Sequence, residues 1–146
     1  MSTFQFRLAT LLRLHEATRD ERRAHLAEAQ RTDAELQRHM TRIGDELRRL
    51  QHECRETAGP GTVNVPRLVE VDRYMTERRA QESVLRRQRQ ALTEEIDRRR
   101  QAVLEADREV QSLEKLRDRQ AEAHRQEEER RESKQLDEAA LQAGRT

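Results

Sequence analysis

Apolar residues recur along the first part of the chain at alternating steps of four and three, starting from Leu8. Ten of the fourteen positions reached in this way are apolar, against 33% of the whole chain. These positions, the first stripe, are Leu8, Leu12, His15, Arg19, Arg22, Leu26, Ala29, Asp33, Leu36, Met40, Ile43, Leu47, Leu50 and Cys54. A mean spacing of 3.5 residues keeps such a stripe on one face of a supercoiled helix, so the pattern predicts a helix over residues 4–56.

The same spacing returns from Leu68 onward, again with ten apolar residues in fourteen positions. This second stripe consists of Leu68, Val71, Met75, Arg78, Glu82, Leu85, Arg89, Leu92, Ile96, Arg99, Val103, Ala106, Val110 and Leu113. It predicts a helix over residues 66–116. Both stripes are narrow, which suits contact with one partner helix rather than with a broad core.

A single strong turn signal separates the stripes, because Gly59, Pro60, Gly61 and Pro66 fall close together. We expect a loop over residues 57–65, with Pro66 in the first turn of the second helix. The stripes are almost equal in length, so the chain is expected to fold back on itself as an all-α, antiparallel coiled-coil hairpin. Pairing between two chains is the competing arrangement.

The pattern thins after Leu113, and residues 117–135 contain no Leu, Ile, Val, Met or aromatic residue. Their composition still favours a helix, so residues 117–143 are expected to form an overhanging helical tail. The whole chain, residues 1–146, is then a single coiled-coil domain.

Composition supports this fold class. Lys and Arg number 30 against 29 Asp and Glu, and the aromatic residues are only Phe4, Phe6 and Tyr74. Such a chain cannot fill the core of a compact globule, whereas its abundant Ala, Leu, Arg, Glu and Gln are strong helix formers. One cysteine excludes an internal disulfide, and no apolar run approaches membrane-spanning length. Without a signal-peptide pattern, a cytoplasmic location is expected.

No motif for catalysis or cofactor binding appears. Glycine-rich phosphate-binding loops are absent, and no histidine pair has the spacing of a helical zinc site. We therefore expect no catalytic, cofactor or metal site and no enzymatic activity. Residues 78–100 carry eight arginines and four acids, which would attract nucleic acid weakly. An ordinary arginine-rich surface is the favoured interpretation, because aromatic stacking residues are missing and the acids are dispersed among the bases.

Apolar residues outside the stripes indicate protein contacts. Phe4, Phe6, Leu11 and Leu14 surround Leu8, and one partner helix cannot bury all of them. Tyr74 precedes a stripe residue and is expected on the flank near the loop. Exposed apolar patches usually mark contact surfaces, and extra packing at the ends of the hairpin is the alternative.

The segments 4–16 (FQFRLATLLRLHE), 113–119 (LEKLRDR) and 134–139 (KQLDEA) resemble the FliJ family of flagellar type III export proteins. The resemblance implies a cytoplasmic coiled coil similar to the stalk of rotary ATPases, next to the membrane-bound export apparatus. The partners it implies are the export ATPase FliI, the gate protein FlhA, export chaperones and FliH, with no specific nucleic acid. The equivalent protein of a virulence secretion system, and a structural coiled coil with weak nucleic-acid binding, are the alternatives.

The resemblance also suggests site residues. The ATPase ring would contact the apolar end of the hairpin, and the gate would contact the flank near the loop. The ring-contact candidates are Phe4, Phe6, Leu8, Leu11 and Leu14, and the gate-contact candidates are Leu47, Leu50, Tyr74, Arg78, Gln81 and Leu85. Family members often carry further aromatics in the gate region, where the first helix of this chain offers aliphatic residues.

Overall fold

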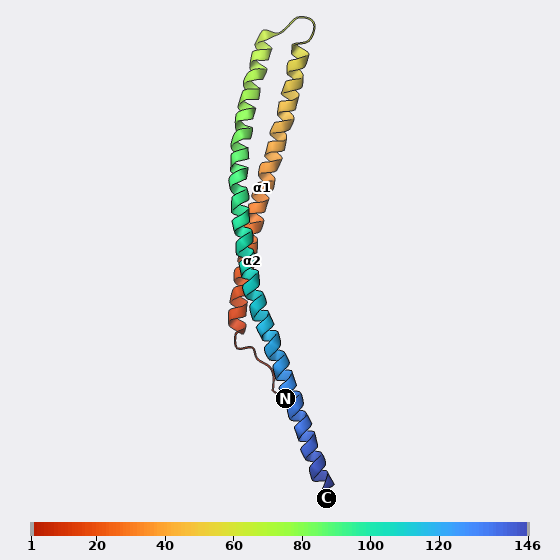
Figure 1. Cartoon of the computed structure of the whole chain (residues 1–146). Helices are drawn as coiled ribbons and strands as arrows, with labels where there is room; N and C mark the ends of the chain where they lie inside the picture. Colours follow the sequence, from red (N-terminus) through yellow and green to blue (C-terminus); the bar gives the residue numbers. More distant parts are fainter. Residues whose placement is uncertain (1, 146) are drawn as a thin grey trace. The chain divides into compact units, whose positions relative to one another are not determined.

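The structure is a computed structural model that describes residues 2–145. It contains two long helices, α1 (Ala9–Thr57) and α2 (Val65–Gly144), joined by a short loop (Figure 1). Residues 2–145 include no strand. The two helices pack against each other as antiparallel neighbours, which confirms the predicted all-α hairpin.

The chain divides into two compact units, and both helices contribute to each. Unit 1 comprises Met1–Arg23 and Ala102–Thr146, and unit 2 comprises Ala24–Gln101. Within each unit, one stretch of α1 lies against one stretch of α2. Each unit therefore has its own share of the apolar contact between the helices.

The buried apolar residues all belong to the two predicted stripes. They are Leu12, Ala29, Ile43, Leu47, Val71, Met75, Leu85, Ile96, Ala106 and Val110. Val71 and Val110 are the two largest side chains that are fully buried. Of the stripe residues, Arg22 and Leu8 lie on the exposed side, Leu8 at 37% exposure. The stripes are thus the surfaces through which the helices pack, as predicted.

Arginines of the second stripe form ion pairs across the two antiparallel helices in unit 2. Arg78 Nε lies 2.5 Å from a Glu46 carboxylate oxygen, and Arg89 Nε donates to Asp33 Oδ1 over 2.9 Å. Each arginine can lay its aliphatic stem along the seam while its charged end reaches the opposite helix. This explains how a coiled-coil seam tolerates polar residues at these positions.

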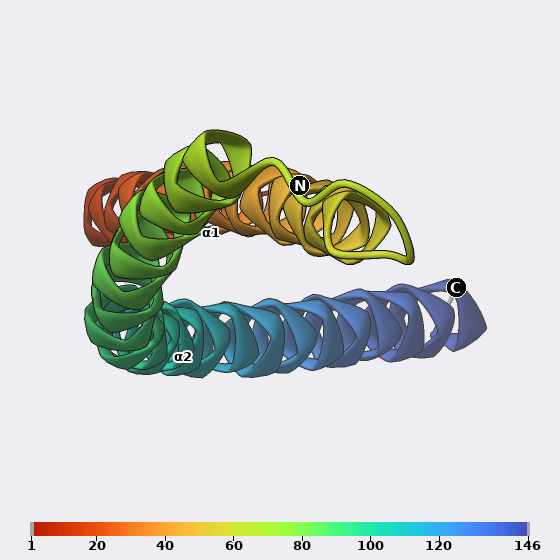
Figure 2. The same ribbon diagram turned by 90° about the horizontal axis from the view of Figure 1, so that it is seen from above.

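The conformation of the loop is explained by its turn-forming residues. Gly61 has a φ of 132°, a conformation that favours glycine. Asn64 caps α2, because its side-chain oxygen accepts a hydrogen bond from the Arg67 backbone N–H over 3.2 Å. Pro66 lies in the first turn of α2, as expected. Figure 2 looks down on this loop, and its observed extent, residues 58–64, is slightly shorter than the predicted 57–65.

The predicted start of the first helix was wrong, since α1 begins at Ala9 rather than at residue 4. Residues 2–8, here called the N-terminal strap, lie along α2 (Figure 1). Ser2 Oγ donates to Glu128 Oε1 over 2.6 Å, and the ring centroids of Phe4 and His124 are 5.8 Å apart. The strap therefore covers part of the expected overhang, and α2 is continuously exposed only from residue 129 onward.

Candidate protein-contact surfaces

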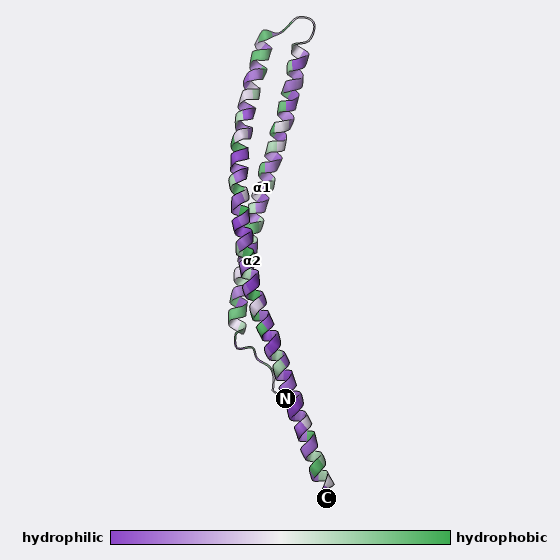
Figure 3. Ribbon diagram, viewed as in Figure 1, coloured by the Kyte–Doolittle hydropathy of each residue, from purple (hydrophilic) through white to green (hydrophobic). Residues whose placement is uncertain are grey.

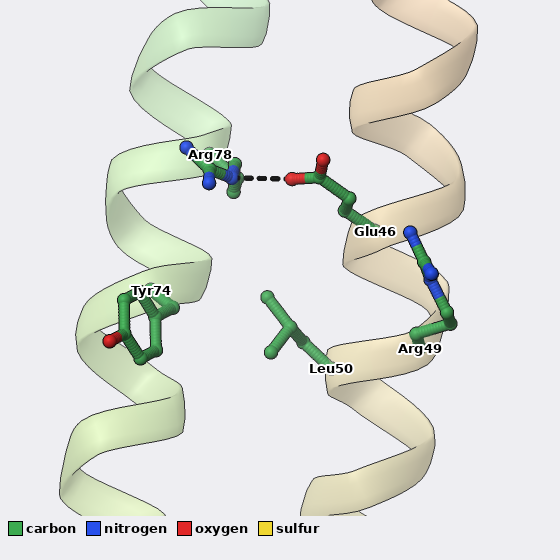
Figure 4. Close-up of a pocket in the computed structure, with 5 residues that line it drawn as sticks. All are labelled: Glu46, Arg49, Leu50, Tyr74 and Arg78. Carbon is green, nitrogen blue, oxygen red and sulfur yellow. Dashed lines mark ion pairs between the residues drawn. The ribbon is translucent and has the colours of Figure 1, made fainter.

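A shallow groove lies between α1 and α2 in unit 2, near the loop (Figure 4). It encloses about 230 Å³ and is lined by Glu46, Arg49 and Leu50 of α1 and by Tyr74 and Arg78 of α2. We call it the tip groove. Three of the predicted gate-contact residues, Leu50, Tyr74 and Arg78, thus come together in one place.

The helical repeat explains how the tip groove forms. Met75 takes the seam position and is buried, so the adjacent Tyr74 stays on the flank with 42% of its surface exposed. Leu50 points toward the tyrosine from the opposite helix (Figure 4). The Glu46–Arg78 ion pair borders this apolar surface, and Arg78 Nη1 also donates to Gln81 Oε1 over 3.2 Å. The groove combines an apolar floor with fixed charges at its edge, which suits a peptide or protein surface.

The other gate-contact candidates have different positions. Leu47 and Leu85 are buried in one cluster with Ile43, Val71 and Met75, and neither lines the tip groove. Gln81 is exposed and helps to line a neighbouring depression of about 410 Å³, together with Val84. Sequence reasoning missed Glu46 and Arg49, although charged residues beside a coiled-coil seam commonly pair across it.

The ring-contact candidates divide into two groups in unit 1. Leu8, Leu11 and Leu14 are 37%, 39% and 62% exposed around the first turns of α1. Apolar residues gather there in Figure 3. Phe4 and Phe6 are half-buried in the strap, whereas Gln5 and Arg7 between and beside them are exposed. Two-residue alternation is typical of extended segments, and this signal in the sequence could have identified the strap.

The arginines of residues 78–100 are largely neutralised by nearby carboxylates. Six of the eight make ion pairs, namely Arg78, Arg86, Arg89, Arg98, Arg99 and Arg100. Hydrogen bonds from Arg98 and then Arg99 lower the pKa of Glu95, which holds this carboxylate in its charged form. Most of the positive charge of residues 78–100 is therefore paired with carboxylates of the hairpin, and little of it is left to bind phosphate groups.

Among residues 2–145, no group of three or more His, Cys, Asp or Glu side chains is arranged to hold a metal ion. Within the same residues, no helix has an apolar stretch long enough to cross a membrane.

A family model described as "Flagellar FliJ protein" matches residues 4–146. The matched region contains the tip groove, most of the strap and both helices in full. No curated protein and no solved structure matches the chain.

Proposed function

Because the chain belongs to the FliJ family of flagellar export proteins, we propose that it is a non-catalytic stalk of the export apparatus that binds the export ATPase FliI. We further propose that its tip groove contacts the gate protein FlhA and that it escorts export chaperones, with FliH as a neighbouring component. In this role it works in the cytoplasm beside the membrane-bound apparatus. It supplies no chemical group to ATP hydrolysis and acts by binding and stabilising the ATPase ring.

The exposed leucines at the start of α1 are the observation that carries the ATPase contact. Leu12 on the first stripe is buried, whereas Leu11 and Leu14 on the same turns are exposed. Three exposed leucines within seven residues form a patch of the kind that protein partners cover. Docking of this patch would depend on apolar burial, so it should persist at salt concentrations that abolish purely ionic contacts.

The ATPase contact can be tested with purified FliI and matched leucine variants. We expect the wild-type protein to raise the ATPase rate, and the double variant Leu11→Ser/Leu14→Ser to lose most of that increase. Leu104→Ser is the control, because Leu104 is an exposed leucine of unit 1, at 45%, on α2. No activation by the wild type would remove the stalk role, and equal activation by all three proteins would place the ATPase contact outside these leucines.

The gate contact calls for a separate binding experiment. Calorimetry with the cytoplasmic domain of FlhA should show weaker binding by Tyr74→Ser than by the wild-type protein. Val69→Ser is the matched control, since Val69 is also an exposed apolar residue near the loop, on α2. Loss of binding in the control alone would place the contact outside the tip groove.

A further inference from the structure

Four arginines on α1 form a line of positive charge in unit 2. Arg31 and Arg38 are seven residues apart, Arg42 and Arg49 are also seven apart, and a step of four joins the two pairs. All four side chains are exposed. At about 1.5 Å per residue, the line extends over roughly 27 Å of helix. We call it the arginine line.

Three of these side chains lie on the face of α1 away from the seam, the fourth, Arg49, also lines the tip groove, and none of them is neutralised within the hairpin. The first stripe occupies the opposite face of α1, through residues such as Leu36, Met40 and Leu47. None of the four arginines makes an ion pair or a side-chain hydrogen bond with any residue that the structure describes. This contrasts with Arg78 and Arg89 of α2, whose charges are satisfied within the hairpin.

The nearby carboxylates do not cancel this charge. Asp45 lies on the same face but is paired with Arg48. Glu28 and Glu35 are the other acids on this face, and the four arginines outnumber them by two. Arg38 and Arg42, one helical turn apart, repel each other, so the isolated hairpin gains nothing from the arrangement. A partner that brings negative charge would relieve this repulsion.

We propose that the arginine line binds an acidic helix of a partner protein, one whose Glu or Asp residues repeat the spacing of the line, as two pairs seven residues apart. Seven-residue steps keep charges aligned along a coiled-coil helix, and charged pairs at such spacing are how neighbouring helices select one another. A depression of about 530 Å³ beside Arg38 and Arg42, lined also by Ala34 and Thr41, gives room for side chains of an adjacent helix.

Other polyanions fit this face less well. The line is one residue wide, and α1 carries no aromatic residue that could stack on nucleic-acid bases. Helices that lie on membranes place an apolar face in the lipid, whereas the apolar face of α1 is occupied by α2. The arrangement of charges therefore favours a helix over a nucleic acid or an anionic membrane.

The test uses a fluorescein-labelled, alanine- and glutamine-based peptide whose four glutamates repeat the spacing of the arginine line. Binding to the full-length protein is measured by fluorescence anisotropy at low salt. We expect Arg31→Gln/Arg38→Gln/Arg42→Gln/Arg49→Gln to bind at least about tenfold more weakly than the wild type. The control carries the same change in charge at four exposed α2 arginines that make no ion pair, through the substitutions Arg73→Gln, Arg79→Gln, Arg87→Gln and Arg108→Gln.

Each outcome bears on the proposal. A loss confined to the arginine-line variant, with an unfolding midpoint no lower than that of the wild type, supports it. Equal losses in the two variants, or no binding of the peptide by the wild type, would overturn it. Tighter, line-dependent binding of single-stranded DNA or of phosphatidylglycerol vesicles would also overturn it, because the partner would then be a different class of molecule.

Discussion

Truncation of Val71 offers the most direct test of the packing between the helices. Val71 is fully buried in unit 2, where it belongs to the same cluster as Ile43 and Leu47 of α1. Val69, two residues earlier on α2, is 59% exposed. The variants Val71→Ala and Val69→Ala therefore make the same chemical change on the same helix, one inside the contact and one outside it.

The expected magnitude follows from the buried methyl groups. Val71→Ala removes two methyl groups at about 0.8 kcal/mol each, and an incompletely filled cavity adds up to about 1 kcal/mol. Alanine is the better helix former by about 0.5 kcal/mol, a gain that both variants share. We therefore expect Val71→Ala to lower the free energy of unfolding by about 1–2 kcal/mol, and Val69→Ala to leave it unchanged or slightly raised.

Urea titration followed by circular dichroism at the helical band measures both values. The shared gain in helix propensity cancels in the difference between the variants, which should be about 2 kcal/mol. If the two variants unfold at the same urea concentration, the second stripe is not the surface on which α1 packs. The antiparallel hairpin would then have to be abandoned.

Three further predictions concern the loop, the tail and the strap. Gly61→Ala should lower the free energy of unfolding by about 1–2 kcal/mol, because Gly61 has a positive φ that alanine rarely adopts. Gly44 lies in open space on α1, so Gly44→Ala should raise the free energy of unfolding by up to about 1 kcal/mol. Thermal unfolding of both variants tests this contrast. Hydrogen bonds from Arg125, and then from Gln126, lower the pKa of Glu122. The ionised carboxylate therefore stabilises α2 at pH values above the ordinary glutamate pKa, and this stabilisation is lost as the pH falls through the lowered pKa of Glu122. Carbon chemical shifts of α2 should therefore show less helix in acid. The variant Glu122→Gln should reduce this pH dependence. Phe4→Ala should shift the ring-proton resonances of His124 by removing the neighbouring aromatic ring, whereas a spectrum unchanged from the wild type would contradict the docked strap.

Much of this fold was predictable because its signals are local and repetitive. The two stripes specify which helix faces are apolar, and all the buried apolar residues lie on them. The Gly59–Pro66 region specifies the turn, because its residues favour turn conformations and cap the second helix. The apolar character of the first turns was likewise visible as an excess of leucine and phenylalanine that one partner helix cannot cover.

Tertiary structure alone decided which candidate side chains are exposed and which charged side chains form ion pairs within the hairpin. Leu47, Leu50 and Leu85 are all stripe residues in the sequence, yet Leu47 and Leu85 are buried in the helix–helix contact, whereas Leu50 is only half-buried and lines the tip groove. The strap was missed because its docking depends on α2 residues more than a hundred positions away. Helical periodicity describes only neighbours along the chain, whereas burial and ion pairing depend on what the opposite helix brings to each position.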